Sequence, residues 1–338
     1  MKRYIVLIVC LLFTAGTTFC QQVRKSRKGI IVIDDDVQTR AMEPYAGSRD
    51  NGAAYANVVN EFKRHYDKAN VYCMIIPNAI GIYCPEEARN WSKDEAEAIR
   101  MIYAQLSPKV HSIEIIDTLR NHRNEEIYLR TDHHWSPLGA YYAARTFASS
   151  ADVPFNDLTS YEPNIVHNFV GTMYKFTRES CIAKHPEDFI YYKPKNVSYE
   201  TTQVNYRYKT LRKRRKRVTV LTATPPRETD FFRYYADGSV AAYSTFMGGD
   251  YNTTAVRTST ANKRRLLILK DSYGNALPPF LFGSFEEIHV VDCRYFIGNI
   301  IKYSKANNIT DVLFANNLIH ASAPVTSQTY KRYMTQSK

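Results

Sequence analysis

The chain has 338 residues, and its 45 Lys and Arg outnumber its 33 Asp and Glu, which gives a formal net charge of +12. This length suffices for one large α/β domain or for such a domain with an insertion, and the basic excess is compatible with an anionic glycan as partner. Nucleic acid, another common partner of basic chains, is disfavoured because the chain begins with an apparent export signal.

The first 20 residues have the pattern of a secretory signal peptide. Lys2 and Arg3 precede an apolar run, Tyr4–Phe13, and small and polar residues continue to Cys20. The run is too short to span a bilayer comfortably, and no later segment could cross a membrane. We therefore expect an exported protein, periplasmic or extracellular, cleaved near Cys20. Acylation of Cys20 to give a lipid anchor is an alternative, although residues 17–19 make a poor lipobox.

Four cysteines remain outside this leader, and they define neither a disulfide pattern nor a zinc site. An oxidising compartment permits disulfides, and four cysteines allow three pairings, but free buried thiols fit the sequence at least as well. Their spacing is not that of zinc ligands. They are Cys73, Cys84, Cys181 and Cys293.

Strands and helices alternate through the first part of the chain. Apolar residues recur at helical spacing over 55–66, Ser92 can cap the next helix, and a short helical segment is expected at 117–121. This alternation predicts a mainly parallel sheet with helices on both faces. Apolar runs predict the strands, at Gly29–Ile33, Val71–Ile76, Val110–Ile116 and Glu126–Arg130.

A polar loop between the last of these strands and a helix carries an acid and two histidines. Ser136 is a natural N-cap, and Pro137 fits the first position of that helix. Residues two apart in an extended segment point the same way, so Asp132 and His134 share a face while His133 points to the other. An Asp beside a His can fix the imidazole tautomer and stabilise the imidazolium, as in a catalytic triad.

The same loop is also a candidate metal site, which the sequence disfavours. Adjacent histidines are expected to diverge, and no second cluster of His, Cys or acidic residues supplies further ligands. The sequence therefore predicts no metal.

The character of the sequence changes between about residues 151 and 263, where strand-like alternation replaces helical periodicity. We interpret this stretch as a β-rich insertion between the two halves of the sheet. Its aromatic residues beside arginines could stack on sugars, or they could simply pack with their hydroxyls in water. The densest basic run, Leu211–Arg217, is by default a solvated turn or strand edge, with an acidic polysaccharide or envelope surface as the alternative partner.

Strands and helices alternate again after residue 263, and Ser272 lies at the first crossover. There its hydroxyl would sit beside free backbone N–H groups, which can stabilise an oxyanion. By spacing alone, a serine at this position is more often a helix cap, and the pattern is not the G-x-S-x-G elbow. The predicted strands are Arg265–Leu269, Ile288–Val291 and Val312–Phe314, and the predicted helices are Ala276–Phe282 and Ile297–Ala306.

Two motifs together resemble those of DHHW-type proteins. They are Asp132-His133-His134-Trp135 and Lys270-Asp271-Ser272-Tyr273, and the resemblance runs from about Gly29 to the end of the chain, through Arg40–Tyr45 and Met74–Asn78. That family resembles the alginate O-acetyltransferase branch of the SGNH hydrolase superfamily. The second motif is similar to the Gly-Asp-Ser block of SGNH enzymes, with Lys in place of the Gly.

The resemblance implies an SGNH-hydrolase-like, flavodoxin-like α/β fold, with a mainly parallel sheet sandwiched by helices, in a single domain over residues 21–338 that includes the β-rich insertion. It implies a triad in which Ser272 is the nucleophile, His134 the base and Asp132 the residue that orients the base. The backbone N–H of Ser272 is the first oxyanion donor. Weaker candidates for oxyanion or substrate contacts are Asn316, Asn317, Arg130, Tyr273, His133 and Gly171.

These features predict an exported serine-dependent acyl (O-acetyl) transferase or esterase that acts on an envelope or exported polysaccharide. An acyl-serine intermediate, resolved by water or a sugar hydroxyl, needs no cofactor. The alternative is a non-catalytic envelope protein that uses the SGNH scaffold to bind glycan. Hydrogen-bond contact between Ser272 and His134 would favour catalysis, and a separation beyond about 6 Å would weaken it. The sequence does not fix the oligomeric state.

Overall fold

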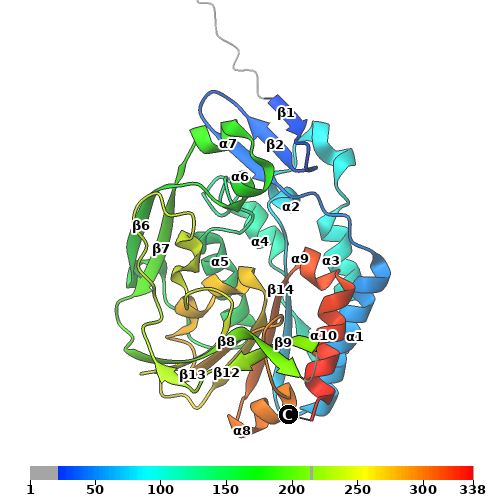
Figure 1. The fold of residues 1–338 in the computed structure, drawn as a ribbon, viewed down its shortest axis with the longest axis vertical. Coiled ribbons are helices and arrows are strands. Elements are labelled where there is room, and N and C mark those ends of the chain that lie inside the picture. The colour runs from blue at the N-terminus through cyan, green and yellow to red at the C-terminus, as the bar shows by residue number, and fades with distance from the viewer. Residues whose placement is uncertain (1–21, 214–215, 338) are drawn as a thin grey trace, which may run out of the picture.

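A computed structural model of the chain describes residues 22–213 and 216–337, and its centre is a large mixed sheet (Figure 1). The strands of this sheet are β4 (Asn70–Ile76), β5 (Val110–Ser112), β8 (Tyr199–Lys213), β9 (Lys216–Ala223), β10 (Arg227–Glu228), β11 (Asn252–Thr258), β12 (Arg265–Lys270), β13 (Glu287–Asp292) and β14 (Asp311–Asn317). Their order is β10-β8-β11-β13-β12-β14-β4-β5, and β9 pairs with β8 outside that order.

Along this order, the five neighbouring strands β5, β4, β14, β12 and β13 run parallel to one another. The strands on the other side of β13, which are β11, β8 and β10, pair antiparallel with their neighbours. β4 pairs in parallel with β5 and β14, and β12 with β14 and β13, whereas β11 pairs antiparallel with β13 and β8. The expected mainly parallel sheet is thus confirmed for the centre of the fold. Because parallel strands end at the same edge, the residues that follow β4, β12, β13 and β14 are brought together there.

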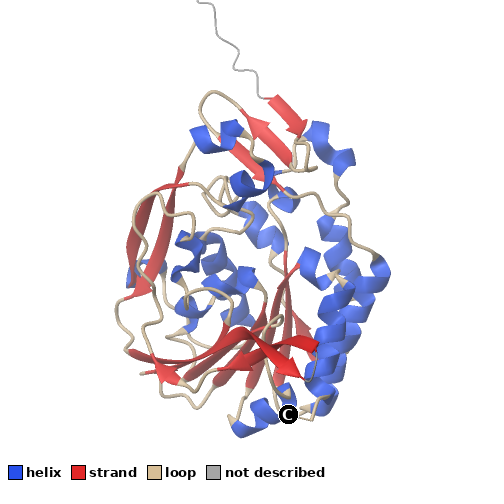
Figure 2. Cartoon of the chain, in the orientation of Figure 1, coloured by secondary structure: helices blue, strands red, loops and turns tan. Residues whose placement is uncertain are grey.

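Helices cover both faces of the central sheet (Figures 1 and 2). They include α1 (Arg49–His65), α3 (Glu95–Tyr103) and α10 (Pro324–Thr335) on one face and α4 (Ile116–Asn121) and α5 (Pro137–Ser150) on the other. Phe62 of α1 packs on Phe314 of β14 with ring centroids 5.4 Å apart, and Phe147 of α5 packs on Tyr72 of β4 at 5.2 Å. Tyr72 pairs with Leu313, the neighbour of Phe314, so these two contacts lie on opposite faces.

Two smaller sheets lie outside the central one. β1 (Gln22–Lys25), β2 (Ile31–Asp34) and β3 (Thr39–Met42) form an antiparallel three-stranded sheet, and β6 (Tyr161–Phe169) pairs with β7 (Glu187–Pro194). The strand expected at 29–33 is therefore present as β2, but it belongs to a small sheet. In the described part of the chain, no helix combines the length and the apolar character needed to cross a membrane.

The structure corrects one predicted helix start. The helix expected after Ser92 begins after Asp94, whose carboxylate accepts hydrogen bonds from the backbone N–H groups of Ala96 and Glu97. Ser92 instead accepts a hydrogen bond from the backbone N–H of Tyr45. A carboxylate at this N-cap also interacts favourably with the helix dipole, so Asp94 is the better cap of the two.

The structure also corrects three predicted elements near the candidate site. The helix expected over Ala276–Phe282 is replaced by two 3₁₀ turns, η4 (Ser272–Ala276) and η5 (Pro278–Leu281), because Pro278 and Pro279 lack the N–H groups of an α-helical ladder. The strand expected over 110–116 is shortened to β5. The segment 126–130 forms an isolated bridge, between Tyr128 and Trp135, in place of the predicted strand.

The four cysteines in the described part of the chain are all free thiols. Cys73 and Cys293 are buried, and Cys84 and Cys181 are partly exposed. This agrees with the reading that they are unpaired. The predicted signal peptide, Met1–Cys20, and the alternative lipid anchor at Cys20 lie outside the described residues.

A buried ionic network closes the end of β12 beside the candidate nucleophile. The Nζ of Lys270, which is 1% exposed, lies 2.9 Å from Asp292 Oδ2 and 3.3 Å from Asp250 Oδ1. Arg294 lies 2.8 Å from Asp292 Oδ2 and 2.9 Å from Asp250 Oδ2. Lys270 and Arg294 hold the pKa of Asp250 well below its usual range, although burial alone would raise it.

We predict that Lys270→Met destabilises the protein by about 3–5 kcal/mol, because it leaves the buried carboxylate of Asp292 and the partly buried one of Asp250 with a single cation. Arg265→Met, at the partly exposed start of the same strand, is the control and should cost about 1 kcal/mol or less. Urea unfolding measures both free energies. Equal losses in the two variants would show that the buried network contributes no more than a surface ion pair.

Candidate active site

The loop that carries the acid and the two histidines is held by its own backbone. The N–H of Leu129 donates to the carbonyl of His134 at 3.2 Å, and the N–H of Ser136 donates to the carbonyl of Ile127 at 3.0 Å. Ser136 caps α5 as predicted, by accepting a hydrogen bond from the N–H of Gly139. These bonds take the place of strand pairing and turn the chain sharply before α5.

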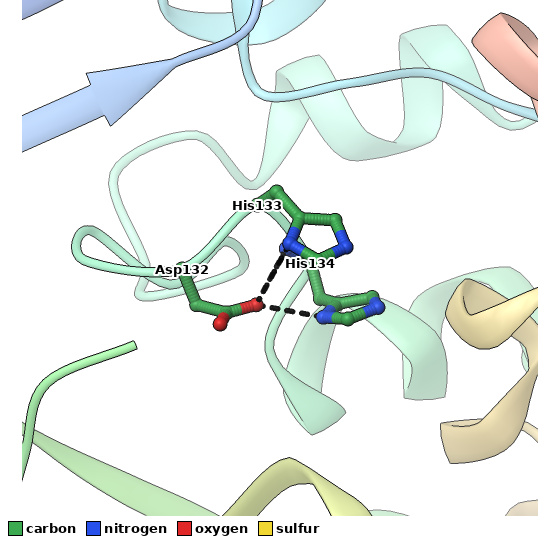
Figure 3. Close-up of side chains that lie close together, drawn as sticks. All are labelled: Asp132, His133 and His134. Atoms are coloured by element: carbon green, nitrogen blue, oxygen red, sulfur yellow. Dashed lines mark hydrogen bonds and ion pairs between the residues drawn. The ribbon is translucent and has the colours of Figure 1, made fainter. Parts of the chain in front are cut away.

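The structure brings Asp132, His134 and Ser272 into one hydrogen-bonded chain. His134 Nε2 lies 2.8 Å from Ser272 Oγ, and His134 Nδ1 lies 2.6 Å from Asp132 Oδ1. An ionised Asp132 accepts the Nδ1 hydrogen, which leaves Nε2 free to accept the hydrogen of the serine hydroxyl. Figure 3 shows the carboxylate of Asp132 facing the two imidazoles.

Asp132 is fully occupied as an acceptor. Its Oδ1 also accepts from the backbone N–H of His134, and its Oδ2 accepts from the backbone N–H and the hydroxyl of Thr172, each at 2.8 Å. Burial alone would raise the pKa of Asp132, but the two neighbouring imidazoles and these hydrogen bonds hold it well below its usual range. Asp132 is therefore ionised at neutral pH, as an orienting carboxylate must be.

The imidazole of His134 is clamped by aromatic rings, one of which the sequence analysis missed. The ring of Tyr243 stacks on His134 with centroids 3.9 Å apart and planes 7° apart. The hydroxyl of Tyr243 and the indole N–H of Trp135 both donate to the backbone carbonyl of Tyr273, at 3.1 and 2.8 Å. Tyr243 lies in the tyrosine-rich stretch 151–263, where no local pattern distinguishes it from its neighbours.

The alternation of side chains along an extended segment predicted that His133 points away from His134, but the two rings lie together. The two ring centroids are 3.8 Å apart, and His133 Nδ1 lies 2.6 Å from the hydroxyl of Thr172. Possible ligand atoms of Asp132, His133 and His134 all lie within 4.8 Å of one another, so this group could hold a metal ion. The two histidines were expected to diverge, which disfavoured a metal, and this expectation is wrong. A metal bound through His134 would compete with its contact to Ser272.

Asn316 and Asn317, predicted as oxyanion donors, are engaged in other contacts. The Asn316 amide donates to Asp271 Oδ2 at 3.2 Å, and the Asn317 amide donates to the carbonyl of Ile76 and to Asn78 Oδ1 at 3.2 and 2.7 Å. The backbone N–H of Asn317 also donates to Asp271 Oδ2. These bonds connect the ends of β4, β12 and β14. Because the two amides are engaged, the backbone N–H of Ser272, at the start of η4, remains the candidate donor to the oxyanion.

A buried carboxylate orients the amide next to Tyr273. Glu95, which is 2% exposed, accepts hydrogen bonds from the backbone N–H and the side-chain amide of Asn78, at 2.8 and 2.6 Å. The hydroxyl of Tyr273 donates to the carbonyl of His133, and its oxygen lies 3.3 Å from Asn78 Oδ1. Tyr273 thus links the nucleophile turn to the histidine loop. Burial raises the pKa of Glu95 to about 8 against the effect of the two hydrogen bonds.

Arg130 and Gly171 make contacts that hold the loop of Asp132 in place. The backbone N–H of Arg130 donates to Glu187 Oε2 at 2.8 Å, and its guanidinium lies 4.0 Å from the same carboxylate. Gly171 begins α6 (Thr172–Thr177), and its N–H donates to the hydroxyl of Thr131 at 2.9 Å. A Cβ on Gly171 would lie 2.4 Å from that of Asp132, so this close approach requires glycine.

The comparisons with known proteins agree on one family. The sequence model of the family described as DHHW protein matches residues 13–291. A crystal structure of a DHHW family protein from Eubacterium siraeum is 36% identical and has a TM-score of 0.80, with 92% of this chain and 97% of that chain covered. A comparison with curated proteins returned no match.

More distant solved structures share the fold. Bacillus cereus PatB1 with a sulfonyl adduct is 18% identical at a TM-score of 0.65, covering 88% of this chain and 97% of that chain. The O-acetyltransferase domain of Pseudomonas putida AlgJ is 13% identical at a TM-score of 0.46, covering 92% and 99%. The latter similarity is too weak to assign an activity to this chain.

We predict that Gly171→Ala destabilises the protein by about 1–3 kcal/mol and displaces Asp132, because the added methyl group has no room. The φ of Gly171, −81°, suits any residue, so the effect is steric. Urea unfolding and a crystal structure of the variant measure it. Unchanged stability and an unmoved Asp132 carboxylate would show that there is room for a methyl group between residue 171 and Asp132.

We predict that Glu95 makes the protein less stable as the pH rises. Its pKa of about 8 lies above the ordinary value of 4.5, so between these values the native state holds a proton that the unfolded state has released. From about pH 5 to pH 8 the unfolding free energy of the wild type should fall by roughly 2–4 kcal/mol more than that of Glu95→Gln. Glu97→Gln, on the exposed face of the same helix, should follow the wild type. Parallel curves for all three proteins would contradict this assignment.

Proposed function

The chain belongs to the DHHW family, and from that premise we propose that it is a serine-dependent acyltransferase or esterase, which moves O-acetyl groups onto or off a polysaccharide. The observation that carries the proposal is the 2.8 Å contact between His134 Nε2 and Ser272 Oγ, within the reach of proton transfer. We also propose that the protein is exported and acts in the periplasm or outside the cell, as its first 20 residues indicate.

In the first step, Ser272 Oγ attacks the carbonyl carbon of an acetyl ester while its hydrogen passes to His134 Nε2. Asp132, ionised and hydrogen-bonded to Nδ1, stabilises the imidazolium that forms. The backbone N–H of Ser272 donates to the oxyanion of the tetrahedral intermediate. When the C–O bond of the donor ester breaks, the proton on Nε2 passes to the departing alcohol, and the acetyl group remains on the serine.

In the second step, the acceptor decides between transfer and hydrolysis. A sugar hydroxyl or a water molecule gives its hydrogen to His134 Nε2 and attacks the acetyl-serine carbonyl. The Ser272 Oγ–C bond then breaks, and the serine recovers a hydrogen from the imidazolium. A sugar acceptor yields an acetylated glycan, and water yields acetate, so exclusion of water from the site determines the outcome.

Two further observations support a serine nucleophile. The motifs around His134 and Ser272 resemble those of the alginate O-acetyltransferase branch of SGNH enzymes. The fold relative PatB1 has been solved with a sulfonyl adduct, and sulfonyl reagents are electrophiles that trap activated hydroxyl groups. The arrangement around Ser272 supplies such activation through His134.

We predict that Ser272→Ala and His134→Ala each lower the rate of p-nitrophenyl acetate hydrolysis by about 10³-fold or more, because each removes a group that the attack on the ester needs. Both substitutions act on the same step, so their effects are not additive. Ser149→Ala, an exposed serine on α5, is the matched control and should keep wild-type activity. Release of p-nitrophenolate, the leaving group of the first step, is followed by its absorbance.

The non-catalytic alternative gives a different result. A glycan-binding protein on the same scaffold would hydrolyse the ester no faster than the buffer does, or at the same slow rate in all four proteins. Either outcome would remove the proposed chemistry and leave binding as the function.

A further inference from the structure

A strongly basic β-ribbon extends the central sheet. It comprises residues 206–213, the second half of β8, which pair antiparallel with residues 216–223 of β9. Six of these sixteen residues are Lys or Arg, and none is Asp or Glu. We call this segment the basic ribbon.

The cations of the basic ribbon face solvent without acidic partners. Arg207, Lys209, Arg212 and Arg217 are exposed, and none of the four forms an ion pair with a residue in the part of the chain that the structure describes. Alternate residues of a strand lie about 7 Å apart on one face, so Arg207 and Lys209 form a row, with Arg212 and its cross-strand partner Arg217 on the opposite face. Like charges at this spacing repel one another, and an anionic partner relieves that repulsion.

The basic ribbon leaves the sheet at the edge that carries Ser272. Asn205, the last residue before the ribbon, pairs with Asn252 at the start of β11, and this start lies beside the C-terminal end of β13. β13 runs parallel to β12, whose C-terminal end leads directly to Ser272. The first ribbon residue is anchored at the same edge, because the N–H of Tyr206 donates to the carbonyl of Tyr251 at 2.8 Å.

A continuous series of contacts connects the nucleophile turn to the ribbon. Asn275 of η4 donates to Asp250 Oδ1 at 2.8 Å, and Asp250 Oδ2 lies 2.9 Å from the Arg294 guanidinium. The residues that follow, Tyr251 and Tyr295, stack with ring centroids 4.1 Å apart, and Tyr251 is 53% exposed. An exposed tyrosine beside an arginine therefore lies between Ser272 and the ribbon.

We propose that the basic ribbon and the Tyr251–Tyr295 pair bind a linear, carboxylate-bearing polysaccharide and hold it across the edge of the sheet at which Ser272 acts. Arginine and lysine side chains bind carboxylates by charge-assisted hydrogen bonds, and an exposed aromatic ring stacks on the apolar face of a sugar. The proposal rests on the proposed function for the role of the polymer, which is to supply the hydroxyl that accepts or carries the acetyl group. Binding itself does not require the chemistry.

The charge and shape of the surface favour a glycan over other polyanions. A lipid surface would be met by many apolar side chains that insert into it, whereas the large hydrophobic side chains that the described ribbon residues expose are Tyr208 and Val218, beside four exposed cations. A nucleic acid would use the charges but has no need of the contact path to Ser272. Both remain outcomes of the test.

The test measures the binding of fluorescently labelled oligogalacturonate by anisotropy, on the full mature chain carrying Ser272→Ala so that turnover cannot intervene. In the ribbon variant, four exposed cations are replaced, by Arg207→Gln, Lys209→Gln, Arg212→Gln and Arg217→Gln. In the control variant, four exposed cations elsewhere are replaced, by Arg64→Gln, Lys68→Gln, Lys109→Gln and Lys331→Gln. Circular dichroism and thermal unfolding establish that both variants are folded.

We expect Kd to rise at least tenfold in the ribbon variant and less than twofold in the control variant, with a weaker salt dependence only in the former. Oligogalacturonate should bind at least tenfold more tightly than single-stranded DNA of equal charge or vesicles of anionic lipid, and neutral dextran should not bind. Equal Kd values in the two variants, absence of oligogalacturonate binding, or equally tight binding of DNA or vesicles would each overturn the inference. Because binding is measured without the nucleophile, its outcome is independent of whether the chain hydrolyses esters.

Discussion

The hydrogen bond between Asp132 and His134 is the interaction on which the arrangement of the site depends. It is buried, it is 2.6 Å long, and it requires that Asp132 stay ionised without access to bulk water. The chain meets that requirement with donors from two distant segments, the histidine loop and the start of α6, where Thr172 supplies two of them. Gly171 permits this approach because it has no Cβ, so α6 can pack directly on the carboxylate.

The surroundings of Ser272 are fixed by polar groups that are satisfied inside the protein. Asp271 accepts from the backbone N–H of Tyr273 and from the N–H of Asn317, which joins the turn after β12 to the end of β14. On the other side, Lys270 and its carboxylate partners hold the strand end itself. A buried network of this kind makes the site rigid, because displacing one member leaves others unpaired at a cost of several kcal/mol. Rigid placement is what a nucleophile and its base need, since proton transfer tolerates little separation.

Much of the fold could be read from the sequence, because strands such as β4, β12 and β14 are short apolar runs buried on both faces. Ser272 could be selected because it follows such a run, and Asp132 and His134 because their motif resembles that of DHHW-type proteins. The three side chains lie in hydrogen-bond contact, and their catalytic role stays a prediction. Local patterns failed where distant contacts decide. The segment before Asp132 bends back on itself in place of a strand, and the ring of Tyr243 reaches His134 from a remote stretch. Likewise, Asn316 and Asn317 lie at the strand end where they were expected, but their amides are taken up by neighbours that are far away in the sequence.

In the proposed mechanism, His134 activates Ser272 as a nucleophile, and chemical labelling can test this activation. The most direct measurement is intact-protein mass spectrometry with peptide mapping after exposure to phenylmethanesulfonyl fluoride. We expect a single sulfonyl adduct on the peptide that contains Ser272, formed at least 100-fold more slowly when His134 is replaced by alanine. Absence of an adduct, adducts spread over other hydroxyl groups, or a labelling rate that is independent of His134 would contradict the proposed activation.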